Sequence, residues 1–188
     1  MNLADNLMAY IQRKLFTLNT GHCITAYSGV MAGYDTIDKT IADPQIYELV
    51  KGAMTQSGDG LIKKFGFDRD AHYKYIDKII NRFKNPYLQD DVARVGREPL
   101  RKLSADDRLV SPLSTAMSFG LPVDLLILGI GAALHYNNPE DAQSVELQEK
   151  ISAKGVSGAF AEVSGVTDSA VLEQVDAAYK KVEKLFQK

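Results

Sequence analysis

The stretch VDLLILGIGAAL at residues 123–134 decides the fold, because it is compatible with two opposite structures. As a strand, it would run into a glycine-rich nucleotide-binding loop whose first two glycines are Gly129 and Gly131. Leu134 stands where such a loop needs a third small residue, and its bulk would hinder close packing of helix on strand. Neither flank alternates strands with helices. We therefore predict a buried helix with glycines at close helix contacts, and no site for a nucleotide cofactor in this chain.

The remaining sequence carries the start and stop signals of helices. Asp43 and Pro44 predict the start of a helix that ends at Gly66. Asp68 predicts the start of the next helix, which Asn85-Pro86 stops. Further helices are predicted at residues 124–136, 139–154 and 168–186. Apolar residues three and four positions apart also predict a first helix that begins near Asp5, with one apolar face made of Leu3, Leu7, Ile11, Leu15 and Leu18.

No segment shows sustained alternation of apolar and polar residues, and no short turn joins two β-rich runs. The sequence therefore predicts an all-α fold of about eight to ten helices around one core, forming a single domain over residues 1–188.

Composition excludes several classes of protein. The 188 residues are 45% hydrophobic with a net charge of −2, which is typical of a globular domain and argues against nucleic acid as the main partner. The N-terminus lacks the pattern of a signal peptide, and the most apolar stretch, residues 119–134, is too short for a membrane span. Cys23 is the single cysteine, so no internal disulfide forms, and we expect it to be a small buried side chain. We expect a cytoplasmic protein.

Three polar residues near the N-terminus suggest chemistry on one helix. On a continuous α-helix Asn19 and His22 share a face, and Lys14 lies about 80° around from His22, so the three could line one wall of a cleft. Leucines and a phenylalanine flank Lys14, so it can be partly desolvated, which favours the neutral amine that accepts a proton. The alternative is an ordinary solvated lysine beside a structural asparagine and histidine.

A basic cluster follows in the middle of the chain, made of Arg94, Arg97, Arg101, Lys102 and Arg108. Arginine forks bind phosphate with paired hydrogen bonds, and lysine adds a point charge. The alternative is a solvated surface in which Glu98, Asp106 and Asp107 neutralise the cations. Asp90 and Asp91 are candidate acceptors for substrate hydroxyls, although acids at a helix N-terminus are the more ordinary interpretation.

Both segments resemble one enzyme family. The segment RKLFTLNTGH, residues 13–22, is similar to the K-x4-N-x2-H signature of the polyol-specific long-chain dehydrogenases. Residues 85–113 resemble the second signature of the mannitol-1-phosphate 5-dehydrogenase branch, and residues 52–67 and 75–83 are similar too. The resemblance covers most of the chain.

The resemblance assigns roles to the polar residues. It implies that Lys14 is the general acid and base, while Asn19 and His22 bind and polarise the reacting oxygen. Arg94 and Lys102 stand at positions that contact substrate in the family. For the phosphate of this branch we expect Arg97 and Arg101.

The family also implies a fold, a cofactor and partners. The fold would be that of the 6-phosphogluconate dehydrogenase C-terminal-like domains, and the reaction would interconvert D-mannitol 1-phosphate and D-fructose 6-phosphate with NAD and without a metal. The three histidines have no ligand spacing that would indicate a metal site: His22, His72 and His135.

In the family a nucleotide-binding Rossmann domain precedes this domain and is its partner. We expect NAD to be bound mainly there, so that this chain folds by itself but turns over no substrate alone. The alternative function is a non-catalytic helical module that binds a phosphorylated ligand or a protein partner.

Overall fold

The computed structural model describes the backbone of residues 3–186 and the side chains of residues 7–186. This part is all-α, as predicted, and its one β feature is an isolated antiparallel bridge between Thr36 and Asp91. The helices in chain order are α1 (Leu3–Arg13), the π-helix η1 (Lys14–Asn19), α2 (Thr20–Ala32), α3 (Ile37–Ile41), α4 (Pro44–Phe65), α5 (Arg69–Phe83), the 3-10 helix η2 (Pro86–Leu88), α6 (Val92–Gly96), α7 (Pro99–Lys102), α8 (Val110–Ser118), α9 (Asp124–Leu134), α10 (Ala142–Ser164) and α11 (Ser169–Phe186).

The predicted caps set the helix ends. The Asp43 carboxylate accepts hydrogen bonds from the N–H groups of Gln45 and Ile46, at 2.9 and 3.3 Å, and so begins α4. Gly66 ends α4 in the left-handed conformation, with φ 70°. Asp68 caps α5 by accepting from the N–H of Ala71 at 2.7 Å. The structure thus confirms these caps. They could be predicted because each involves only residues within one helical turn.

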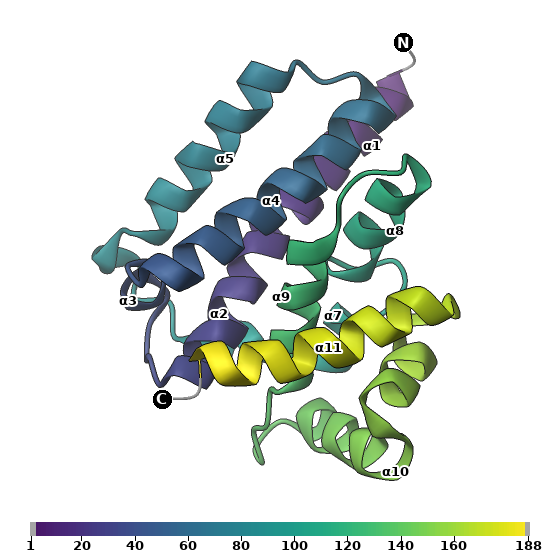
Figure 1. The fold of residues 1–188 in the computed structure, drawn as a ribbon. Coiled ribbons are helices and arrows are strands. Elements are labelled where there is room, and N and C mark those ends of the chain that lie inside the picture. Colours follow the sequence, from purple (N-terminus) through teal and green to yellow (C-terminus); the bar gives the residue numbers. More distant parts are fainter. Residues whose placement is uncertain (1–2, 187–188) are drawn as a thin grey trace.

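The glycine-containing stretch that decides the fold is helix α9, which lies between α2 and α4 on one side and α11 on the other (Figure 1). A Cβ on Gly131 would lie 2.9 Å from the carbonyl carbon of Ala178, and one on Gly129 would lie 2.5 Å from the Ile24 side chain. The glycines therefore sit at close helix contacts, as predicted. With 11 residues α9 is short, and none of the helices in the described part is long and apolar enough to cross a membrane.

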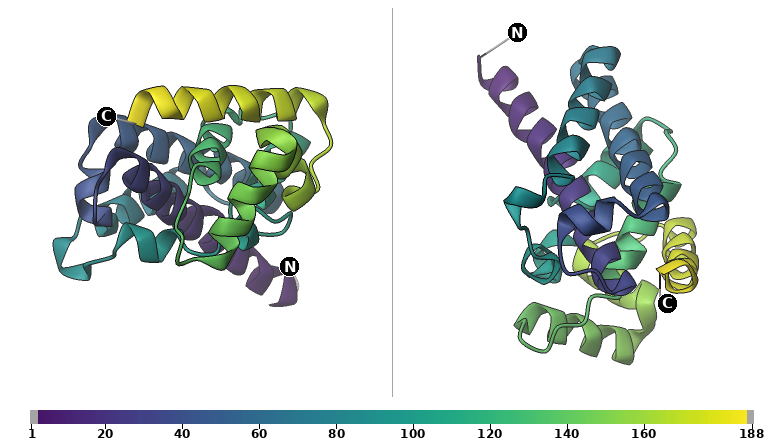
Figure 2. Two further views of the ribbon diagram at one scale, coloured as in Figure 1. Left: turned by 90° about the horizontal axis from the view of Figure 1, so that it is seen from below. Right: turned by 90° about the vertical axis from the view of Figure 1, so that its left-hand side faces the viewer.

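The first helix is neither a regular α-helix throughout nor covered along its whole apolar face. The helical path continues from α1 into α2, but six residues between them form η1 instead of α-helix. The apolar face is in part exposed: Leu7 is 63% and Ile11 52% exposed, while the side chain of Leu3 lies outside the described residues. The reason is that α1 stands largely clear of the other helices (Figure 2).

Helix α10 also begins and ends elsewhere than predicted. It starts at Ala142, three residues after the predicted Pro139, because Asp141 accepts a hydrogen bond from the N–H of Gln143 and caps it. The predicted end at Lys154 coincides with a break at Gly155, whose φ of 76° interrupts the helix before it resumes.

Cys23 is buried in the core and free, as predicted. Burial raises the pKa of its thiol to about 12, so it is unreactive at neutral pH.

Candidate active site

The π-helix η1 determines how Lys14 and Asn19 are arranged. The N–H of Thr20 donates to the carbonyl oxygen of Leu15, five residues back. On an uninterrupted α-helix Lys14 and Asn19 would point about 140° apart, and the extra residue of a π-turn reduces this to about 40°. Both side chains accordingly line one hollow, together with Tyr10, Ile11 and Leu15.

The same turn brings His22 closer to the direction of Lys14. Our sequence prediction assumed a continuous α-helix and placed Lys14 and His22 about 80° apart; this was wrong, and the π-turn reduces the angle to about 20°. The two residues remain roughly two turns apart along the helix. The structure therefore places Lys14 and Asn19 at one hollow and His22 at a second, which follows along the same helix face.

Lys14 is exposed in this chain, so the predicted partial desolvation is not present. Phe16 points into the core and is fully buried, which removes one of the apolar neighbours on which the prediction depended. Leu15 and Leu18 are only half-buried. The exposed side chains of Leu7, Met8, Tyr10 and Ile11 lie on α1, directly before Lys14. A lysine beside an uncovered apolar surface becomes desolvated only when something covers that surface.

His22 is held by a stacked ring and a carboxylate. Its ring stacks on Phe83, with centroids 5.3 Å apart, and its Nε2 lies 3.1 Å from Oδ2 of Asp90. The other Asp90 oxygen accepts from Arg94 at 2.6 Å. Burial lowers the pKa of His22 below its ordinary value, although Asp90 raises it; the charges of Arg94 and Lys102 lower it further. The imidazole is therefore neutral at pH 7, and Nε2 carries the proton that the carboxylate accepts.

The two neighbouring acids have different roles. Asp91 accepts from the N–H of Arg94 at 2.9 Å and begins α6, as the helix interpretation predicted. Asp90 does not cap the helix and instead joins His22 to Arg94. Nothing in the sequence indicated this contact, because 68 residues separate Asp90 from His22.

A cleft of about 540 Å³ lies beside His22 and contains the whole basic cluster. Five cations line it against three carboxylates, so the cleft favours an anion. The charged lining residues are Arg94, Arg97, Arg101, Lys102 and Arg108, with Glu98, Glu140 and Asp141.

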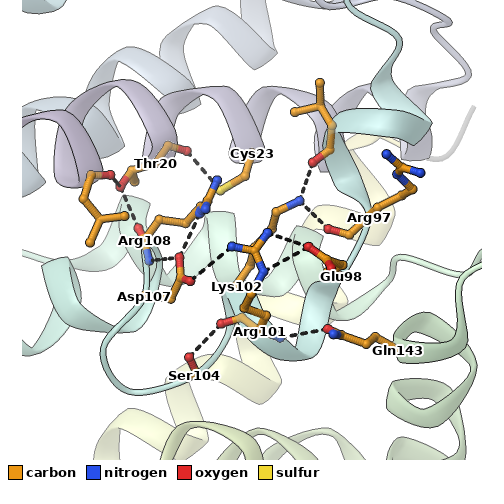
Figure 3. Close-up of polar contacts among 12 residues, drawn as sticks. Thr20, Cys23, Arg97, Glu98, Arg101, Lys102, Ser104, Asp107, Arg108 and Gln143 are labelled. Carbon is orange, nitrogen blue, oxygen red and sulfur yellow. Dashed lines mark hydrogen bonds and ion pairs between the residues drawn. The ribbon is translucent and has the colours of Figure 1, made fainter.

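Lys102 is a buried lysine that binds the backbone of two other residues of the cleft wall. It is 4% exposed, and its ammonium donates to the carbonyl oxygens of Val95 and Arg97 (Figure 3). It also lies 5.9 Å from the centre of the Tyr27 ring. Burial lowers the pKa of Lys102 to about 8, so at pH 7 it is still mostly charged. Two of its three N–H donors are used by the backbone, which leaves one for a ligand.

The other cations of the cleft differ in whether they have a carboxylate partner. Arg101 donates twice to Glu98, at 2.6 and 3.0 Å, and Arg108 donates to Asp107 at 2.8 Å. For these two the ion-paired alternative fits. The Arg97 guanidinium points away from Glu98 (Figure 3), and no residue in the described part forms an ion pair with it. Arg97 is thus the most available cation for an anionic ligand.

The described residues provide neither a metal site nor a dinucleotide site. Within residues 7–186 no three histidine, cysteine or acidic side chains converge as ligands for a metal. The glycine-containing stretch is the interior of α9, buried from Leu126 to Leu134, so its backbone cannot approach a pyrophosphate. The one stretch that resembled a nucleotide-binding loop therefore does not fit NAD.

Known proteins match this chain over nearly its whole length. The family model described as "Mannitol dehydrogenase C-terminal domain" matches residues 6–183. A D-sorbitol dehydrogenase in substrate-free form aligns with TM-score 0.75 and 16% identity over 96% of this chain and 41% of its own. The Pseudomonas fluorescens mannitol 2-dehydrogenase, in ternary complex with NAD and D-mannitol, aligns with TM-score 0.73 and 20% identity over 94% of this chain and 38% of its own. The chain thus spans about two-fifths of the length of these structures.

Proposed function

The chain belongs to the mannitol dehydrogenase C-terminal domain family, and from this premise we propose that it is the catalytic and substrate-binding part of an NAD-dependent mannitol-1-phosphate 5-dehydrogenase. Its reaction would interconvert D-mannitol 1-phosphate and D-fructose 6-phosphate. The observation that carries the proposal is that Lys14 and Asn19 line one hollow, while His22, farther along the same helix path, lines a cleft with five cations.

In this proposal Lys14 moves the proton of the reacting oxygen. In the oxidation direction its neutral amine takes the proton of the substrate hydroxyl, and in the reduction direction its ammonium returns that proton. The neutral amine needs a site from which water is excluded. The exposed apolar surface of α1, made of Leu7, Met8, Tyr10 and Ile11, is a surface that a nucleotide-binding domain would cover. Such a domain would also bring NAD, which accepts the hydride when it is bound.

Asn19 and His22 would orient the substrate. The Asn19 amide is only half-buried and lies in the hollow of Lys14, so it can donate to the oxygen from which Lys14 takes the proton. His22 lines the cationic cleft on the same helix path, where it would bind the reacting oxygen together with Asn19. Asp90 would fix the imidazole ring through its Nε2, and Arg94 would hold Asp90 in place.

The phosphate would bind in the cleft, with Arg97 as its first contact. Carbon 5 of D-mannitol 1-phosphate, which is oxidised, lies near the opposite end of the polyol from the phosphate. If the phosphate binds at Arg97 and Lys102, the opposite end of the polyol, with carbon 5, would therefore lie along the helix face toward Lys14. Binding energy from the phosphate positions the reacting carbon, so it raises the rate and not only the affinity.

The test is an activity assay on the chain combined with a separately expressed nucleotide-binding domain of a polyol dehydrogenase. We expect NADH formation from D-mannitol 1-phosphate, a much slower reaction with D-mannitol, and loss of activity in Lys14→Met. An equally active Lys14→Met variant would overturn the proposed role of Lys14. Preference for D-mannitol would overturn the phosphate specificity.

The alternative is a non-catalytic helical module, which the exposed apolar face of α1 favours, because such a face fits a protein partner. The outcome that supports this alternative is calorimetric binding of D-mannitol 1-phosphate to the chain without activity in the combined protein.

A further inference from the structure

The π-turn between α1 and α2 needs a hydrogen-bond partner from outside its own helix. A turn with i→i+5 bonds holds one residue more than an α-helical turn, and the return to α-helical pairing leaves a carbonyl without an intrahelical donor. A buried carbonyl without a donor is costly, so the turn persists only if another group supplies one.

Ser57 on α4 supplies that donor. Its hydroxyl donates to the carbonyl oxygen of Phe16, inside η1, at 2.6 Å. Both side chains are fully buried, so water cannot replace the bond. A second hydroxyl lies at the end of the turn: Thr20 is 2.6 Å from the carbonyl oxygen of Arg108 and 3.1 Å from that of Leu15. Ser57 is the donor that comes from a different helix.

Close packing of α4 on this region allows the contact. A Cβ on Gly21 would lie 2.4 Å from the sulfur of Met54, one turn before Ser57 on α4. Gly21 therefore lets α4 approach the helix path near η1 and bring the Ser57 hydroxyl within reach.

If the turn relaxed to α-helix, α1 and not α2 would rotate. Nine residues of α2 are buried, whereas α1 exposes Leu7, Met8, Tyr10 and Ile11. Removing the extra residue of the π-turn rotates α1 by about 100° relative to α2. Lys14 would then turn away from the face of Asn19 and His22, while the cationic cleft would stay as it is.

We infer that Ser57 is a positioning residue of the active site: its hydroxyl holds the π-turn that aims Lys14 at the substrate oxygen. This inference rests on the proposed function, because Lys14 has to be the proton-transfer group for its direction to matter. The hydrogen bond itself, and its effect on the turn, do not depend on that function.

The first test reads the register of the turn without any activity. Long-range HNCO spectra of the isotope-labelled chain detect couplings across hydrogen bonds. We expect the Thr20 nitrogen to couple to the Leu15 carbonyl carbon in the wild type and to the Phe16 carbonyl carbon in Ser57→Ala. Ser28→Ala is the matched control, because it removes a buried hydroxyl of α2 that has no partner in the described structure, and it keeps the Leu15 coupling. Retention of that coupling in Ser57→Ala would overturn the inference.

The second test measures kinetics on the chain combined with a nucleotide-binding domain. We expect Ser57→Ala to lower kcat for D-mannitol 1-phosphate by about 10²-fold, with KM within about threefold, since the cleft is unchanged. A shifted coupling with unchanged kcat would overturn the positioning role. Ser57→Cys, which fills the same space with a weaker donor, gives an intermediate result if Ser57→Ala proves unstable. A fully active Lys14→Met variant, in contrast, rejects the proposed function and leaves the coupling result standing.

Discussion

The Nε2 atom of His22 lies 3.1 Å from Oδ2 of Asp90, and the same carboxylate binds Arg94 through its other oxygen at 2.6 Å. One acid thus connects the predicted oxygen-binding residue to the first cation of the cleft. Because Asp90 raises the pKa of His22 against the effect of burial, its charge keeps that pKa closer to the ordinary value.

We expect Asp90→Asn to lower the pKa of His22 further. The substitution removes the negative charge that favours the imidazolium, while Arg94 and Lys102 remain and disfavour it. An NMR titration of the imidazole signals measures the change. Asp91→Asn is the control, because Asp91 caps α6 and makes no contact with His22. A rise in the His22 pKa in Asp90→Asn, or an equal shift in Asp91→Asn, would contradict the assignment.

His72 makes the fold sensitive to acid. It is fully buried, and neither ring nitrogen has a partner within residues 7–186. Burial and then the charge of Arg13 lower the pKa of His72 to about 4, against a weaker opposing effect of Asp59. In the unfolded chain His72 is therefore protonated below about pH 6.5, whereas in the folded chain it is protonated only below about pH 4.

Stability should accordingly fall as the pH decreases from about 6.5 to about 4, by ~3 kcal/mol from His72. His22, whose pKa is also lowered, adds to the fall in the same direction. His72→Phe, which keeps the stacking on Phe67, should flatten most of this slope. Urea unfolding at several pH values tests the prediction, and an unchanged slope in the variant would refute it.

Gly131 should tolerate no side chain. A Cβ there would lie 2.9 Å from the carbonyl carbon of Ala178 and 3.0 Å from the nitrogen of Tyr179, both backbone atoms of α11. We expect Gly131→Ala to lower the free energy of unfolding by about 1–3 kcal/mol. Gly158→Ala is the control, since its Cβ would meet only the Cβ of Lys154. Thermal melts that show equal stability for the two variants would argue against the α9–α11 contact.

Arg97 should matter more than Arg101 for binding a phosphate. Arg101 already donates twice to Glu98, whereas the Arg97 guanidinium has no ion-pair partner among the described residues. We expect Arg97→Met to weaken binding of D-mannitol 1-phosphate by about 10- to 100-fold, and Arg101→Met by less than about threefold. Isothermal calorimetry on the chain measures both. A larger loss of affinity in Arg101→Met than in Arg97→Met would contradict this and would place the phosphate at Arg101, beside Glu98.

The sequence predicts well whatever depends on neighbouring residues. The helix caps at Asp43, Gly66 and Asp68 involve only residues within one turn, so they follow from the local order of residues. The helical nature of residues 123–134 follows from the bulk of Leu134 and the lack of flanking strands. The gathering of the basic residues also follows, since they lie within 15 positions of one another.

What depends on distant residues could not be predicted. The π-turn at Lys14 is held by Ser57, 41 residues away, and no periodicity signals such a bond. The contact of His22 with Asp90 spans 68 residues. An apolar stripe predicts that its residues share one face of a helix. It does not predict whether the rest of the chain covers that face, as the exposed Leu7 and Ile11 show.

The most direct measurement of the central claim is chemical rescue at Lys14. In the chain combined with a nucleotide-binding domain, Lys14→Ala should lose at least about 10²-fold in kcat for D-mannitol 1-phosphate. Added methylamine or ethylamine should then restore the rate in proportion to its concentration, because a free amine takes the place of the missing one. Wild-type activity in Lys14→Ala without any amine would contradict the claim that Lys14 transfers the proton.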